Sequence, residues 1–143
     1  MMDRTLHPNT RTLMAAWRRM TASPETLKAG PQTRDHPDLV SRLFVIQEAG
    51  DHVWVFRNAG ESLSKILGRE LADQNFLDFW TGHDRKLLSA FLDGIVTEKA
   101  PGIARGRGET LTGQRVDTEM MFAPLELGAG SKGGHRLLGL YQT

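Results

Sequence analysis

Residues 81–84, Thr-Gly-His-Asp, bring together a hydroxyl, an imidazole and a carboxylate, the side-chain types of a hydrolytic triad. A triad needs its base within hydrogen-bond reach of the nucleophile and a third group that orients the base. Here the residues begin a predicted helix over 81–99, where Thr81 and Asp84 are typical of a capping box. No carboxylate pair is flanked by the apolar residues that tune acid–base groups, so the sequence predicts a protein that is not an enzyme.

Other groups that bind metals or phosphates are scattered or out of context. His7, His36, His52 and His135 show no spacing typical of a metal site. The glycine-rich stretch 102–113 follows a helix and lacks the Gly-Lys-Ser/Thr of a phosphate loop. Cysteine is absent, which excludes disulfides, thiolate catalysis, cysteine-ligated metals and flavin–cysteine photochemistry.

Aromatic side chains at regular intervals are the remaining candidates for a binding site. They would form a ligand pocket or a packed core, and the spacing favours a core. Asn58 would add a polar group to such a pocket or cap a helix that starts near Gly60, and the sequence favours capping. The candidate pocket residues are Trp54, Phe56, Asn58, Phe76, Trp80, Leu88, Phe91, Thr118, Met120 and Phe122.

These residues belong to elements that alternation, helical spacing and turn residues predict. The expected order is a helix over 9–21, a connector over 23–38, strands Leu43–Gln47 and Val53–Arg57, helical segments over 60–67, 70–80 and 81–99, strands over 102–112 and 114–127, and a last strand over 135–143. Strands that flank a helical middle predict an α+β fold, a five-stranded antiparallel sheet with helices on one face.

Two elements have a clear apolar face. In the helix over 81–99 this face is predicted to contain Leu87, Leu88, Phe91, Leu92 and Ile95. In the strand over 114–127, Val116, Thr118, Met120 and Phe122 share one face, and Asp117, Glu119, Met121 and Ala123 share the other.

The N-terminal helix carries an apolar stripe formed by Leu13, Met14, Trp17 and Met20. Such a stripe packs on the sheet or on a second copy of the chain, and we expect it to form a homodimer. The predicted organisation is a helix and connector over residues 1–38 followed by one domain over residues 39–143.

Composition limits the class of protein. The chain has 143 residues, a length typical of one domain, and a net charge of +1, which argues against nucleic-acid binding. No apolar run reaches the roughly 18 residues needed to span a bilayer. The N-terminus lacks the pattern of a secretory signal, so a cytoplasmic location is expected.

A series of short motifs resembles the PAS domain pattern, in which an aromatic strand leads to Asn-x-Ala or a similar step and a short helix that ends in glycine. The matching positions are Phe56, Asn58-Ala59, Leu67-Gly68 and Leu71. The chain looks most like an alphaproteobacterial PAS subfamily, through Trp17, Arg57 with Gly60, Leu67-Gly68-Arg69-Glu70-Leu71, Trp80 with Asp84-Arg85, Gly113-Gln114, Glu119, Pro124-Leu125 and Leu138-Gly139-Leu140. Asn58 replaces an aliphatic residue of that subfamily and Leu67 an aromatic one, so its ligands are not transferred to this chain.

The resemblance implies a PAS fold and a role in signalling. It implies sensor histidine kinases or other regulators as partners, or alternatively a small molecule bound between the sheet and the helices. Haem-binding PAS domains place their axial ligand further along the long helix than His83, where this chain has Leu88 and Phe91. We therefore expect neither haem nor covalent flavin and, as the leading reading, no cofactor.

Overall fold

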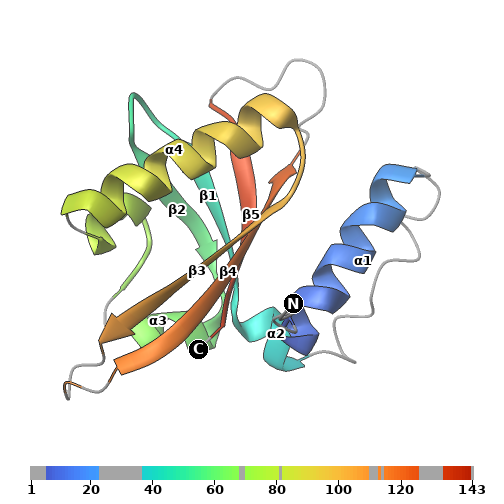
Figure 1. The fold of residues 1–143 in the computed structure, drawn as a ribbon, viewed down its shortest axis with the longest axis horizontal. Coiled ribbons are helices and arrows are strands. Elements are labelled where there is room, and N and C mark those ends of the chain that lie inside the picture. The colour runs from blue at the N-terminus through green and yellow to red at the C-terminus, as the bar shows by residue number, and fades with distance from the viewer. Residues whose placement is uncertain are drawn as a thin grey trace, which may run out of the picture.

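A five-stranded antiparallel sheet in the order β2-β1-β5-β4-β3 forms the centre of the computed structural model (Figure 1). The structure describes residues 6–22, 37–67, 70–80, 82–109, 113, 115–125 and 134–142. The strands are β1 (Leu43–Glu48), β2 (Trp54–Ala59), β3 (Gly102–Glu109), β4 (Arg115–Leu125) and β5 (Arg136–Gln142). The helices are α1 (Pro8–Ala22), α2 (Pro37–Ser41), α3 (Glu61–Leu67), the 3-10 helix η3 (Phe76–Phe79) and α4 (Gly82–Glu98). The predicted α+β fold is confirmed.

The inner face of the sheet, the one covered by η3 and α4, carries the larger apolar cluster. Alternate residues of each strand point to this face, and they meet Leu88, Leu92 and Ile95 of α4. The ring of Phe44 lies over Gly139 on the neighbouring strand so closely that a Cβ at that position would collide with it. The sheet and the helices are therefore in direct side-chain contact.

Leu87 does not belong to the buried face of α4, contrary to the prediction. It is 56% exposed, whereas Leu88 is 6% exposed. Neighbouring helical residues differ by about 100° around the axis, so only one of the two points squarely at the sheet.

The outer face of the sheet is covered by α1, which lies on the side opposite α4 (Figure 1). Leu13 is buried against Met121, Ala123 and Leu140, and Met14 and Trp17 pack at the border of this cluster. The apolar stripe thus packs on the sheet, one of the two possibilities left open by the sequence. The side chain of Met20 lies outside the described part of the chain.

Asn58 is on the opposite face from Trp54 and Phe56, contrary to the prediction. The register of β1 and β2 pairs Ile46 with Phe56 but Val45 with Asn58, so residue 57 is an extra residue in β2. Such a β-bulge shifts the alternation of side chains by one. Asn58 is therefore exposed and shares a face with Val45, on the outer side of the sheet.

The predicted capping role of Asn58 is not found either. Helix α3 begins at Glu61, and Gly60 provides the backbone carbonyl that accepts from Leu63 N. Asn58 makes no side-chain hydrogen bond to another residue that the structure describes. The bulge carries its side chain away from the start of the helix.

The connector ends in an additional short helix. Residues 37 and 38 belong to α2, which was not predicted, so the predicted boundary between residues 38 and 39 lies inside this helix. Residues 23–36, the capping residue Thr81, and Gly68, Arg69 and Gln114 of the motifs lie outside the described residues. Among the helices that are described, none combines the length and apolarity required to cross a membrane.

Asn75 fixes the start of η3 to the edge of β2. Its side-chain oxygen accepts from Leu77 N at 3.1 Å, as an N-cap does, and also from Trp54 N at 3.0 Å. One amide thus satisfies two backbone donors on different elements.

We expect Asn75→Ala to lower the free energy of unfolding by about 1–2 kcal/mol, because it removes an N-cap and leaves the Trp54 amide without its acceptor. Asn58→Ala is the matched control and is expected to change stability by less than about 0.5 kcal/mol, as usual for a surface site. Urea denaturation of both variants measures the difference. Equal effects would contradict the role of Asn75.

Candidate functional site

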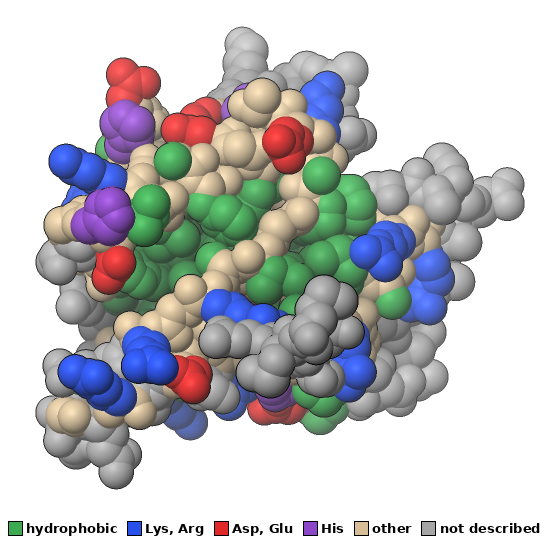
Figure 2. Space-filling view, viewed as in Figure 1, with side chains coloured by type: hydrophobic (Ala, Val, Ile, Leu, Met, Phe, Trp, Pro, Cys, Tyr) green, Lys and Arg blue, Asp and Glu red, His purple; other side chains and the backbone are tan. Residues whose placement is uncertain are grey.

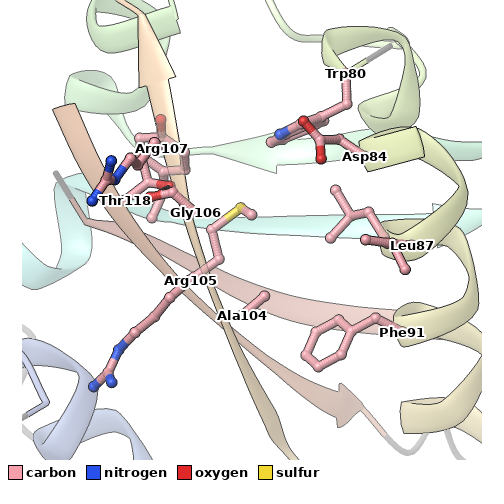
Figure 3. Close-up of a pocket in the computed structure, with 12 residues that line it drawn as sticks. Trp80, Asp84, Leu87, Phe91, Ala104, Arg105, Gly106, Arg107 and Thr118 are labelled. Atoms are coloured by element: carbon pink, nitrogen blue, oxygen red, sulfur yellow. Dashed lines mark hydrogen bonds between the residues drawn. The ribbon is translucent and has the colours of Figure 1, made fainter. Parts of the chain in front are cut away.

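A partly open cleft of about 350 Å³ lies between α4 and the inner face of β3 and β4 (Figure 3). Leu87, Leu88 and Phe91 form the wall on α4, with Trp80 just before that helix. The strands contribute Ala104, Gly106, Thr118 and Met120, and Tyr141 of β5 lies behind them.

Small residues on β3 create the cleft. Gly102, Ala104 and Gly106 pair with Phe122, Met120 and Thr118 and so share the inner face. At Gly102 the helix is close, because a Cβ there would lie 2.9 Å from the Phe91 ring. At Gly106 a Cβ would meet only Thr118 Oγ1, at 3.7 Å. The cleft therefore opens toward the end of β3.

The structure brings together only part of the predicted pocket. Trp80, Leu88, Phe91, Thr118 and Met120 line the cleft, whereas Trp54, Phe56, Phe76 and Phe122 are buried in the packed cluster beneath it. Asn58 borders a separate surface hollow with Ser64 and Glu70.

The buried aromatic rings contact one another rather than enclose a space. Phe76 stacks on Phe44 with centroids 5.6 Å apart and lies 4.4 Å from the Trp80 ring. Phe122 meets Phe44, Phe76 and Phe91 in edge-to-face geometry at 5.4–6.0 Å. These are the separations of directly packed aromatic pairs. The interior beneath the cleft is filled by side chains.

Three charged residues line the cleft, and Asp84 of α4 is the acidic one. Arg105 and Arg107 contribute to its border, but their guanidinium groups pair with Glu119 and Asp117 on the outer side of the sheet. Figure 3 shows the Arg105 side chain directed away from α4. Burial raises the pKa of the Tyr141 phenol, which stays protonated at neutral pH. The cleft therefore combines an apolar wall with the Asp84 carboxylate and suits a group that is mainly apolar.

A second cluster, on the outer face, attaches the N-terminus of α1. The Glu119 carboxylate accepts from Thr10 Oγ1 at 2.6 Å, from His7 N at 3.0 Å and from Arg105 Nε at 3.2 Å. Thr10 is fully buried. Glu119 thus acts as a cap that β4 supplies to a helix distant in sequence, and a carboxylate is favourable at that end of a helix.

The pKa of Glu119 is the balance of opposing effects. Burial alone would raise this pKa, but the hydrogen bonds from Thr10 and His7 and the neighbouring Arg105 lower it below its ordinary value. A carboxyl group whose pKa is lower in the folded than in the unfolded protein stabilises the fold at pH values above the unfolded-state pKa. This stabilisation is lost as the pH falls through the folded-state pKa. Attachment of α1 should therefore weaken below about pH 4, where glutamate ordinarily titrates.

We expect Glu119→Gln to lower the free energy of unfolding at neutral pH by about 1.5–3 kcal/mol, the range for hydrogen bonds to charged groups. Asp117→Asn is the matched control, since Asp117 lies on the same strand as Glu119 and pairs with Arg107 of β3, but its side chain is 91% exposed. Amide exchange of α1 should rise in the first variant only and lose its acid dependence there. Equal exchange in both variants would contradict the role of Glu119.

Two histidines, His52 and His83, lie outside the cleft. His52 Nδ1 lies 2.8 Å from Ser89 Oγ and joins the β1–β2 hairpin to α4. His83 is exposed in the first turn of α4, away from the cleft. Within the described residues, no three His, Cys, Asp or Glu side chains form a group that could hold a metal ion. Because His52 and Ser89 are far apart in the sequence, no local pattern could have identified this contact.

Comparisons with known proteins agree with this geometry. A sequence profile of the PAS domain matches residues 5–142, nearly the whole chain. A comparison with curated proteins found no significant match.

Several solved structures share the fold. A cysteine-to-serine mutant of Vivid, a fungal blue-light photoreceptor, has 14% sequence identity and a TM-score of 0.53, covering 72% of this chain and 77% of that one. The light state of the blue-light photoreceptor Aureochrome1 LOV has 10% identity and a TM-score of 0.54, covering 77% and 85%. An RNA-binding Light-Oxygen-Voltage receptor has 16% identity and a TM-score of 0.54, covering 77% and 31%. At these identities the likeness concerns the fold.

Proposed function

Because this chain belongs to the PAS domain family, we propose that it is a non-enzymatic signalling module that acts by binding other proteins in a bacterial cytoplasm. Sensor histidine kinases or related regulators are the partners that we propose. The observation that carries this proposal is the packed interior, in which Phe44, Phe76 and Phe122 fill the space beneath the cleft. A module with such an interior would signal through its surface.

The attachment of α1 supports the same proposal. Met14 and Trp17 are only partly buried where Leu13 packs on the sheet, and the Trp17 indole N–H donates to Pro124 O at 3.4 Å. The exposed part of this apolar stripe is the surface that we propose for contact with another chain. One similar structure is a light-state dimer of Vivid. We include a homodimer through α1 in the proposal, and assignment to the alphaproteobacterial subfamily stays a prediction.

Capture of binding proteins from native lysate, followed by titration of each purified candidate, tests the proposal. A signalling protein that binds the chain directly is the expected result. Failure of every purified candidate to bind would overturn it.

A second candidate function is the sensing of a small molecule, which the cleft of about 350 Å³ beside Trp80 and Phe91 favours. One of the similar structures concerns a flavin analogue in a Light-Oxygen-Voltage domain. A bound chromophore would give visible absorbance, and any other ligand would add mass in native mass spectrometry. Purified protein with neither signal would exclude a resident ligand.

A further inference from the structure

The two edges of the sheet differ in how their backbone is covered. At β2, Phe56 N donates to Gln74 O at 2.9 Å, Asp73 N donates to Phe56 O at 3.2 Å, and Asn75 bridges to Val55. At β3, no segment pairs with the free side of the strand in the part of the chain that the structure describes. A row of unpaired backbone groups is a template for another extended chain.

The cleft runs along this same edge. Ala104 and Gly106 of β3 face it, and these small residues leave room between the strand and α4. Leu87, 56% exposed, projects beside that room. Figure 2 shows apolar side chains on both sides of the diagonal β3 backbone, toward α4 and toward α1. An extended segment on the β3 edge would place every second side chain in the cleft.

The outer face of β3, on the side of the sheet opposite the cleft, carries two basic residues. Arg105 and Arg107 point outward, and their acidic partners Glu119 and Asp117 lie on β4, away from the free edge. Opposite charges in directly opposed positions stabilise a strand pair. A segment that adds to β3 is therefore favoured when its outward positions are acidic and its inward positions apolar.

Arginines on an edge strand also discourage aggregation. That role accounts for Arg105 and Arg107 but not for the exposed Leu87 or for the small residues opposite it.

We propose that the β3 edge and the adjoining cleft are the docking site for an extended segment of a partner protein, with apolar residues alternating with acidic ones. The segment adds as a sixth strand and inserts its apolar side chains between β3 and α4. This inference rests on the proposed function, since it assigns the surface and the partner chemistry through which the module would act.

Selection of short random peptides from a display library tests the site without a known partner. Peptides enriched on the wild-type chain should alternate apolar and acidic residues and should slow amide exchange in β3. Leu87→Glu should weaken their binding by about tenfold or more, the effect of losing about 1.4 kcal/mol at a contact. Ile66→Glu is the matched control, because Ile66 is the other exposed large apolar residue in the described part of the chain and lies on α3.

Gly106→Val supplies a second variant that fills the cleft from the strand. Its Cβ has space, and β-branched residues are favourable in strands. It should also weaken peptide binding while the protein keeps its thermal stability.

Three outcomes would overturn the inference: no enriched peptide, enriched peptides that bind Leu87→Glu and wild type equally, or protection of β3 that rises with protein concentration alone. The last would mean that a second copy occupies the edge. If a captured signalling protein binds wild type and Leu87→Glu equally, the proposed function stands and only this docking site is wrong.

Discussion

Replacing Phe122 with alanine is expected to lower the free energy of unfolding by about 3–5 kcal/mol, the range for removal of a buried phenylalanine. Phe122 is fully buried, and its ring contacts Phe44, Phe76 and Phe91. Loss of the ring leaves a void that these rigid neighbours cannot easily fill. Urea denaturation, monitored by circular dichroism, measures the change.

Phe122→Leu is the control, because it keeps most of the apolar volume and should cost clearly less than the alanine variant. If Phe122→Ala costs less than about 1 kcal/mol, the interior is not tightly packed, since such a value is typical of an average substitution. That result would favour an internal ligand over a protein-binding module.

Replacing Leu13 with glutamate is expected to release α1 from the sheet. Leu13 is 6% exposed among Met121, Ala123 and Leu140, where an ionised carboxylate would have no partner. The cost should be about 2–5 kcal/mol, comparable to the loss of a buried leucine. A free helix of 15 residues is marginal in water, so amide protection across α1 should largely disappear.

Ala15→Glu is the matched control, since Ala15 is exposed on the same helix and receives the same residue. It should leave the exchange of α1 unchanged. Loss of protection in both variants would mean that α1 is held by something other than its apolar stripe.

The double variant Leu13→Glu/Trp17→Glu should sediment as a monomer, and an unchanged dimer would exclude the α1 interface.

Local patterns in the sequence predicted most of the elements that build the fold. Alternation identified the strands, and the spacing of Leu88, Leu92 and Ile95 identified α4. These patterns work because each half-buried element must bury one face, whatever its neighbours are.

The errors concern features that depend on pairing between distant segments. Asn58 changed faces because of a bulge that is defined only by the register with β1. Glu119 was noted as part of a motif, but its role depends on Thr10 and His7, more than a hundred residues away. The opening beside Leu87 arises because glycines of β3 lie opposite α4, a juxtaposition that no local pattern contains.

Direct binding between purified proteins tests the central claim, that this PAS domain acts through protein contacts. The immobilised chain captures proteins from native lysate, and each captured protein is purified and titrated against wild type by calorimetry, with native mass spectrometry of the purified chain in parallel. We predict saturable binding of at least one sensor kinase or other regulator, and a chain that carries no stoichiometric small molecule. Absence of direct binding, together with a bound small molecule in nearly every chain, would contradict the claim.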